Sequence, residues 1–330
     1  MTDRKQIQML NANAQPLSSQ TLLQGSQPRQ ASQCTLTGFG IAGNTAGHLN
    51  QTGEGDALAN ATQEDKPRAL FPIYVPDASG AYLAINPYSS SKLELPSDKG
   101  AKVQMEPELV VRFAVDYDSS RNAGKTVCAL SPVSMSVMND ATYRNRQVSK
   151  LAEKKNWGPA SKGLAASAME VGDFSASGEL DHWRLCGFHC RADEWQLCGK
   201  DTAITEYTFF YAQLTSWIQR AIITQNVRNT QNTVSASRNY EVALHNIHDL
   251  LQGAGSPPEI LVSVGAVRYT PYGETHVLAD NDKTAVILYD SRKWQIEQIA
   301  QQLQTSTLSR EQGLDVGIIA LIQDVTVAAS

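Results

Sequence analysis

Two carboxylates stand at the head of a nearly continuous apolar run, and this arrangement limits the local fold more than any other feature of the chain. Glu106 and Glu108 are two residues apart, and the run from Glu108 to Val115 is broken only by Arg112. Such a run predicts a β-strand, on which side chains two apart emerge from the same face. Adjacent carboxylates that face inward raise each other's pKa unless a cation lies between them. The pattern therefore predicts a cation site or, as the alternative, a solvated acidic edge strand.

The chain from Val103 onward is mostly strand, interrupted by three helices without regular strand-helix alternation. This order argues for an α+β, mostly β domain. The helices are predicted at Thr205 to about Gln225, Asn239 to Leu251 and about Arg292 to Leu303. Further strands are predicted at Phe71 to Val75, Leu185 to Cys190, Trp195 to Cys198, Ile260 to Val267 and Ala285 to Tyr289.

Composition divides the chain into three predicted parts. Residues 1–34 are rich in Gln and Ser without a lasting helix or strand period, which is typical of a flexible tail. Residues 35–100 form an N-terminal segment with a long, polar, Gly-rich loop, and residues 101–330 form the main domain. The glycines at 38–47 and 53–55 predict a mobile lid.

Charge and hydropathy exclude several classes of protein. The 330 residues carry 28 Lys plus Arg against 33 Asp plus Glu, a formal net charge of −5, which disfavours a general binder of nucleic acid or anionic membranes. The longest apolar candidate, Val316 to Gln323, is far shorter than the roughly 18 residues that span a bilayer. Five cysteines and the absence of a signal peptide at the start predict free thiols and a cytoplasmic location.

A cluster of Cys186, His189, Cys190 and Cys198 raises the alternative of a structural zinc site. Its spacing does not match the usual paired Cys-x-x-Cys knuckles. We interpret the cysteines as small apolar fillers of two strands that turn at Ala192-Asp193.

A third acidic residue, Asp140, follows the pair about thirty residues later in the sequence. The segment Asn139-Asp140-Ala-Thr-Tyr-Arg144-Asn-Arg-Gln147 begins about thirty residues after Glu108. In order, spacing and internal offsets it resembles the Asn-Asp-x-x-x-Arg-x-x-Gln segment of the fumarylacetoacetate hydrolase superfamily, which follows a Glu-x-Glu strand. The chain looks closest to a little-characterised branch of that superfamily, of the unknown-function type.

Other elements extend the resemblance over roughly residues 37 to 290. They are Asn44 with His48, Tyr88 in a Pro-Tyr-Ser-Ser segment, Lys162 in Trp157-Gly-Pro-Ala-Ser-Lys-Gly, and Ser263 in a strand that ends at Gly265. The resemblance implies a mixed β-roll or sandwich with peripheral helices. It also implies a homodimer.

Roles for these residues follow from the resemblance and from oxygen-ligand chemistry. Glu106, Glu108 and Asp140 are hard oxygen ligands that suit Mg²⁺ best, with Mn²⁺ or Ca²⁺ as alternatives. The implied reaction is hydrolytic C–C cleavage in an acylpyruvate-like oxo acid, with a metal-stabilised enolate. His48 is then the base. Lys162 and Arg144 are expected to supply fixed positive charge. Gln147, Ser263 and Tyr88 are expected to contact the substrate.

Several of these residues also have simpler interpretations. His48 alone would be a loop histidine, and Lys162 would be one more solvated lysine beside Lys150, Lys154 and Lys155. Arg144 would instead pair with Asp140 and orient it.

Departures from the family pattern affect the predicted reaction more than the fold. Gln51 stands where competent relatives often have a glutamate that pairs with the histidine, and Glu54 is a possible substitute. Asn145 replaces the aspartate of an Arg-Asp pair. The alternatives are therefore a decarboxylase or isomerase of the same superfamily, or a non-catalytic metal and carboxylate binding protein.

Overall fold

The computed structural model describes residues 36–52, 66–78, 82–120, 125–225, 244–309 and 316–328. Strands outnumber helices in these ranges, which confirms the α+β, mostly β class. No helix within them is long and apolar enough to cross a bilayer. The predicted tail at 1–34 lies outside the described residues, and the boundary predicted at residue 101 stays a prediction.

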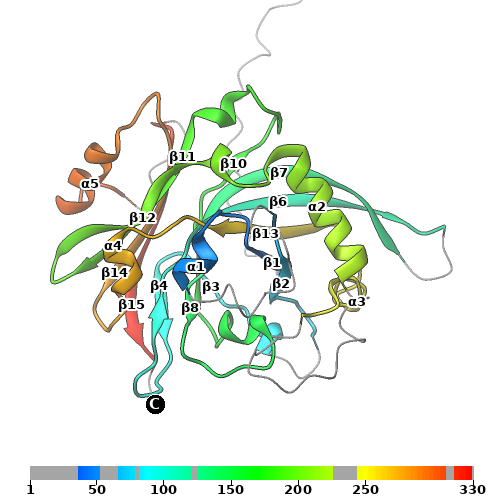
Figure 1. Cartoon of the computed structure of the whole chain (residues 1–330), viewed down its shortest axis with the longest axis horizontal. Coiled ribbons are helices and arrows are strands. Elements are labelled where there is room, and N and C mark those ends of the chain that lie inside the picture. The colour runs from blue at the N-terminus through cyan, green and yellow to red at the C-terminus, as the bar shows by residue number, and fades with distance from the viewer. Residues whose placement is uncertain are drawn as a thin grey trace, which may run out of the picture.

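The larger sheet has eight strands in the order β2-β1-β13-β6-β7-β9-β3, with β10 also paired to β7. It crosses the centre of Figure 1. Strands from the first 100 residues join it directly, because β1 runs parallel to β13 and antiparallel to β2. The strands are β1 Thr37–Ala42, β2 Ala69–Tyr74, β3 Tyr88–Ser89, β6 Pro107–Asp118, β7 Thr126–Asn139, β9 Lys162–Leu164, β10 Met169–Glu170 and β13 Glu259–Ala266.

A five-stranded sheet in the order β12-β11-β14-β15-β4 packs against the larger sheet, and β5 pairs with β8 beside them. The predicted turn at Ala192-Asp193 is confirmed: both residues have positive φ, 53° and 61°, and they join β11 to β12. The strands of these sheets are β4 Lys92–Leu95, β5 Val103–Gln104, β8 Thr142–Tyr143, β11 Trp183–Arg191, β12 Glu194–Ala203, β14 Lys283–Asp290 and β15 Ile318–Val327.

In Figure 1 the helix α5 lies at the left edge and α2 and α3 lie to the right, whereas α1 lies near the centre of the view. The first predicted helix is shorter than expected, because the chain forms a 3-10 turn at Ile204–Glu206 and α2 begins only at Tyr211. The second is α3, which begins only at Ile247: of the residues predicted to precede it, 239–243 lie outside the described ranges and 244–246 are not helical. The helix α4 has no counterpart among the predicted helices. The helices are α1 His48–Thr52, α2 Tyr211–Thr224, α3 Ile247–Gly253, α4 Pro271–Thr275 and α5 Ile296–Gln304, and the other 3-10 turns are Tyr82–Ala84, Leu151–Lys154 and Glu179–His182.

The two faces of β6 point to different surroundings. Leu109, Val111 and Phe113 belong to the main core, which also contains buried residues of the five-stranded sheet such as Leu288. Val110 faces a smaller cluster on the opposite side of the sheet. Because side chains alternate along a strand, Glu106 and Glu108 emerge on the same side as Val110, away from the main core.

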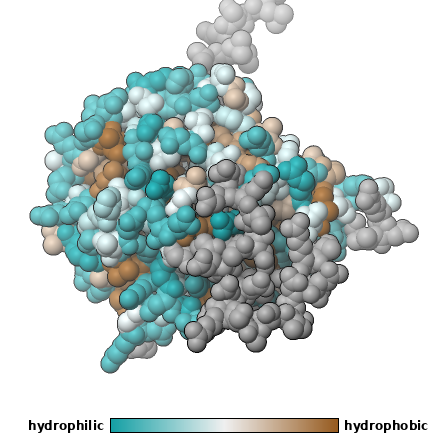
Figure 2. Space-filling model, in the orientation of Figure 1, coloured by the Kyte–Doolittle hydropathy of each residue, from teal (hydrophilic) through white to brown (hydrophobic). Residues whose placement is uncertain are grey.

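The face of the molecule in Figure 2 is mostly hydrophilic where the structure describes it. In Figure 2 the hydrophobic colour is divided among several separate patches. The large apolar side chains that are exposed in the described ranges are Ile85, Ile223, Val316 and Val327.

Candidate metal centre

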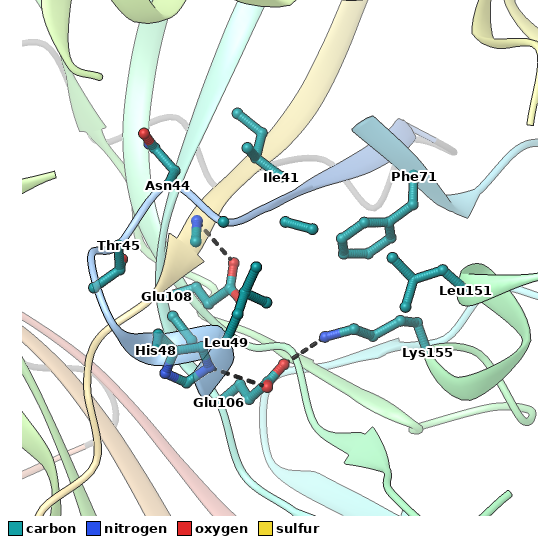
Figure 3. A pocket seen from close by; sticks show the side chains of 14 residues that line it. Ile41, Asn44, Thr45, His48, Leu49, Phe71, Glu106, Glu108, Leu151 and Lys155 are labelled. Atoms are coloured by element: carbon teal, nitrogen blue, oxygen red, sulfur yellow. Dashed lines mark hydrogen bonds and ion pairs between the residues drawn. The ribbon is translucent and has the colours of Figure 1, made fainter. Parts of the chain in front are cut away.

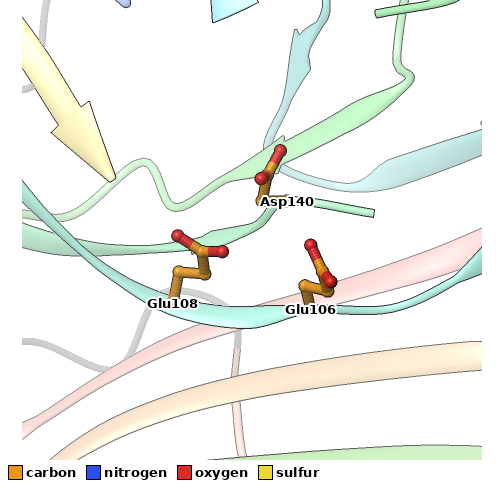
Figure 4. A group of neighbouring side chains, drawn as sticks. All are labelled: Glu106, Glu108 and Asp140. Carbon is orange, nitrogen blue, oxygen red and sulfur yellow. The ribbon is translucent and has the colours of Figure 1, made fainter. Parts of the chain in front are cut away.

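The β6–β7 hairpin brings the three acidic residues together. Glu106 directly precedes β6, Glu108 is the second residue of that strand, and Asp140 directly follows the last residue of β7. The register pairs Pro107 with Asn139, and the amide N of Asp140 donates to the carbonyl O of Glu106 at 2.9 Å. All three carboxyl groups are buried, and their ligating oxygens lie within 4.8 Å of one another (Figure 4). Elsewhere in the described ranges no such group of three acidic, His or Cys residues occurs, and this includes the stretch from Cys186 to Cys198 for which zinc was the alternative interpretation.

Three cations surround the carboxylates. Arg144 Nη2 donates to Glu106 Oε1 at 2.5 Å, and Lys162 Nζ lies 3.1 Å from Asp140 Oδ1. Lys155 Nζ bridges two carboxylates, since it donates to Glu106 Oε2 and, at 2.6 Å, to Asp140 Oδ2. The simpler interpretation of Arg144 placed it beside Asp140, whereas the structure pairs its guanidinium with Glu106.

The buried position of Lys155 differs from the solvated position that the sequence suggests. The sequence groups Lys155 with solvated lysines, yet it is 4% exposed and its ammonium lies 5.2 Å from the centre of the Phe71 ring. The 3-10 turn before it buries Leu151 and Ala152 against the body of the protein, which directs the following side chain inward. A lysine in a polar run has no local signal that distinguishes it from its neighbour Lys154, so the sequence could not reveal this.

The two glutamates have opposite electrostatic surroundings. Burial raises the pKa of Glu106, but Arg144 and Lys155 outweigh burial and hold that pKa well below its usual range. Burial raises the pKa of Glu108 well above its usual range, and the Asp140 carboxylate adds to the effect. Burial also lowers the pKa of Lys162 to about 8, against the opposing attraction of Asp140. Glu106 is therefore held as a carboxylate, whereas Glu108 favours its protonated form while no further cation is near.

His48 reaches this cluster from the first turn of α1. Its Nε2 lies 3.4 Å from Glu106 Oε1, and its ring centre lies 5.2 Å from that of Tyr269. Its Nδ1 is buried without a hydrogen-bond partner among the described residues. The predicted lid is wrong for its first half, because residues 37–42 form the buried strand β1. His48 is thus already buried beside Glu106, with 6% of its surface exposed, and the glycines predicted at 53–55 lie outside the described residues.

Gln51 has a structural role on the same helix. Its Nε2 donates to the carbonyl O of Tyr269 at 3.2 Å and to Glu274, and its Oε1 accepts from the amide N of Tyr269 at 2.9 Å. Asn44 likewise holds the preceding loop, because its side chain binds the backbone of Phe209 and Val264. Glu54, the predicted substitute acid, lies outside the described residues.

Gln51→Glu should destabilise the protein rather than rebuild an acid beside His48. A glutamate loses the amide donor and places a carboxylate against the carbonyl O of Tyr269 and the carboxylate of Glu274, so we expect a loss of about 1–3 kcal/mol. Thermal unfolding should show a lower Tm for Gln51→Glu and an unchanged Tm for Asn50→Asp, an exposed change on the same helix. A Tm equal to that of the wild type would contradict this role.

Three residues predicted to contact substrate have different positions. Ser263 is fully buried, and its Oγ donates to Glu108 Oε2, so it contacts a carboxylate of the cluster. Tyr88 has a buried OH without a hydrogen-bond partner among the described residues, and the Asp140 charge adds to the burial that raises its pKa. Gln147 is exposed and does not line the cavity described below.

Further residues of the site had no sequence signal. Thr142 Oγ1 donates to Glu106 Oε2 at 2.8 Å. Tyr269 OH donates to the carbonyl O of Met105 at 2.7 Å and accepts from Arg144 Nη2 at 3.0 Å. Gln104 Oε1 accepts from Arg144 Nε at 2.9 Å. These partners hold Arg144 and Glu106 in place from segments distant in the sequence.

A small cavity opens onto the cluster. Glu106, Glu108, His48 and Lys155 form its polar part, and Figure 3 shows Glu106 between His48 and Lys155. It offers about 30 Å³ to a water-sized sphere, room for about two waters. The opposite wall is apolar and includes Ile41, Leu49, Phe71 and Leu151.

The donor set fits a hard divalent ion. Three carboxylates supply the oxygen ligands that Mg²⁺, Mn²⁺ and Ca²⁺ prefer, and they converge from one strand and the end of its neighbour. Glu108 Oε2 is oriented by Ser263 Oγ and by the amide N of Gly265 at 3.1 Å, a second layer of contacts typical of metal ligands. The structure thus defines a buried acidic centre that can hold a divalent metal.

Comparison with known proteins places the chain in a family. The sequence profile of a family described as "Family of unknown function (DUF5718)" matches residues 56–325, and the chain belongs to this family. No curated protein sequence matches the chain. The prediction that the chain belongs to a family of unknown-function type is thereby confirmed.

The chain is also similar to several solved structures, at low sequence identity. The protein Cg1458, solved with an inhibitor, is 14% identical, with 88% of this chain and 77% of that chain covered and a TM-score of 0.49. A yeast fumarylacetoacetate hydrolase family protein is 14% identical, with 89% and 94% covered and a TM-score of 0.43. The apo form of 2-keto-3-deoxy-D-arabinonate dehydratase is 10% identical, with 89% and 74% covered and a TM-score of 0.43.

Proposed function

We propose that the chain is a divalent-metal-dependent enzyme that cleaves a C–C bond in a small acidic oxo compound, such as an acylpyruvate, by hydrolysis. The observation that carries the proposal is the convergence of three buried carboxylates within 4.8 Å, at a cavity that also contains a histidine. Mg²⁺ is the proposed ion, held by Glu106, Glu108 and Asp140. Bound there, it would withdraw electrons from the oxygens of the substrate and so stabilise the charge released when the bond breaks.

The side chains of the protein have distinct parts in this reaction. His48 Nε2 faces the triad and would take the proton of an attacking water, a task that imidazole performs near neutral pH. Arg144 orients Glu106, and Lys162 orients Asp140 from its buried position. The apolar wall formed by Phe71 and Leu151 excludes water from one side and strengthens charge interactions in the cavity.

One observation favours a second candidate, a non-catalytic metal and carboxylate binding protein. In the part of the chain that the structure describes, the carboxylate beside His48 is Glu106, itself a proposed metal ligand, and Gln51 is engaged by Tyr269. A histidine without a separate acid partner is a weaker base.

We also propose that the protein is a homodimer, as the family resemblance implies.

The proposed activity can be tested with a panel of substrates. Purified protein with Mg²⁺ or Mn²⁺ should hydrolyse at least one acylpyruvate, followed as loss of the absorbance of the enol form, and EDTA should abolish turnover. Oxaloacetate in the same panel reports decarboxylation through pyruvate release. Metal binding without turnover of any compound would favour the binding protein instead.

A further inference from the structure

We propose that Lys155 acts as a resident cation that competes with the divalent ion, so that metal binding requires its ammonium to leave the carboxylates. This inference rests on the metal site of the proposed function. Lys155 Nζ contacts Glu106 Oε2 and Asp140 Oδ2, which are oxygens of two of the three proposed ligands. An ammonium at this position stands where the two carboxylates would share a metal ion.

The other oxygens of these two carboxylates are also engaged. Glu106 Oε1 accepts from Arg144 Nη2 and lies 3.4 Å from His48 Nε2, and Asp140 Oδ1 lies 3.1 Å from Lys162 Nζ. All four oxygens of these two carboxylates therefore contact a cation, and a divalent ion would have to share each ligand oxygen with a cation unless one of the cations leaves. A carboxylate cannot point the same lone pair at both an ammonium and a metal ion.

Lys155 is the cation best placed to leave. It lines the cavity, whereas Arg144 and Lys162 do not. Arg144 is tied by Gln104 and Tyr269, and Lys162 Nζ also donates to the carbonyl O of Ala141 with no exposed surface. A lysine has four rotatable bonds, and Figure 3 shows the Lys155 side chain extending alongside Phe71 and Leu151 toward Glu106.

The charges of the centre support the same conclusion. The carboxylates of Glu106, Glu108 and Asp140 carry three negative charges when ionised, and Arg144, Lys155 and Lys162 carry three positive charges. A divalent ion added beside all three cations would bring two positive charges without counter-charges into a buried site where the charges already balance, which is unfavourable. Withdrawal of one ammonium removes the nearest repulsion and frees two ligand oxygens at once.

The proposal predicts that removal of the ammonium strengthens metal binding. Mn²⁺ affinity, measured by isothermal titration calorimetry, should rise at least about tenfold in Lys155→Met, which keeps an unbranched apolar side chain. Lys154→Met is the matched control, because it removes the same charge one residue away, and its affinity should stay within about threefold of the wild type. Lys155→Gln, which keeps a donor without the charge, should also bind more tightly.

A thermal readout makes the test independent of catalysis. Without metal, Lys155→Met leaves the carboxylates short of one counter-charge, so its Tm should be below that of the wild type. Mn²⁺ should then raise its Tm by more than it raises that of the wild type. The double variant Glu108→Gln/Lys155→Met should lose the tighter binding, which would locate the ion at the triad.

The outcomes separate this inference from the proposed function. Equal or weaker Mn²⁺ binding by both Lys155 variants, with clear binding by the wild type, overturns competition and leaves the metal centre intact. Absence of binding in wild type and variants alike overturns both. Binding by the variants alone supports competition in its strongest form.

Discussion

Glu108→Gln should lower the affinity of the protein for Mn²⁺ and Mg²⁺ by at least about a hundredfold. The substitution removes one of three charged oxygen ligands from the centre, and second-layer contacts alone are typically worth 10–100-fold in metal affinity. Among the three carboxylates, Glu108 is the most informative to change. Burial and the neighbouring Asp140 raise its pKa well above the usual range, so an uncharged amide resembles its form without metal.

The substitution Glu108→Gln distinguishes the loss of a metal ligand from the loss of the folded structure. The amide oxygen introduced by Glu108→Gln can still accept the hydrogen bonds from Ser263 and Gly265, so thermal unfolding without metal should change little. Calorimetric titration measures the affinity, and Glu170→Gln, an exposed change on β10, is the matched control. Wild-type affinity in a folded Glu108→Gln protein would show that the triad is not the metal centre.

His48→Ala should lower turnover of a cleaved substrate by roughly a hundredfold or more and leave Mn²⁺ affinity almost unchanged. A positioned general base typically contributes 10²–10⁴-fold to a rate. His48 Nε2 faces Glu106 from 3.4 Å, and that carboxylate keeps its contacts with Arg144, Lys155 and Thr142 when the imidazole is removed. The effect should therefore fall on kcat rather than on the metal.

His182→Ala provides the control, because His182 is an exposed histidine outside the cavity lining in the described structure. Steady-state kinetics with saturating metal measures the change in kcat, and calorimetry measures the metal affinity. Full activity in His48→Ala would remove the imidazole from the mechanism. A parallel loss of metal binding would instead make His48 a support of the ligand Glu106.

The sequence alone determined the local parts of the centre. Side chains two apart on a strand share a face, so the sequence predicts that Glu106 and Glu108 emerge together. The structure confirms this, because their carboxylate oxygens lie within 4.8 Å of each other at the beginning of β6. The ordered motifs that include Asp140, Arg144 and Lys162 also predicted which distant segments meet. Strand and helix periods likewise indicated the mostly β class, because each depends on the pattern within a few residues.

Only the tertiary structure decided which cations and hydrogen-bond partners complete the site. The sequence indicates a solvated lysine at position 155, whereas in the structure the 3-10 turn before it buries Leu151 and Ala152 and Lys155 itself is buried. The sequence likewise indicates a missing acid at Gln51, whereas in the structure the Gln51 side chain binds the backbone of Tyr269. Gln51 and Tyr269 are 218 residues apart in the sequence. Burial and partners of this kind depend on how sheets and turns pack, a property that no local pattern of residues encodes.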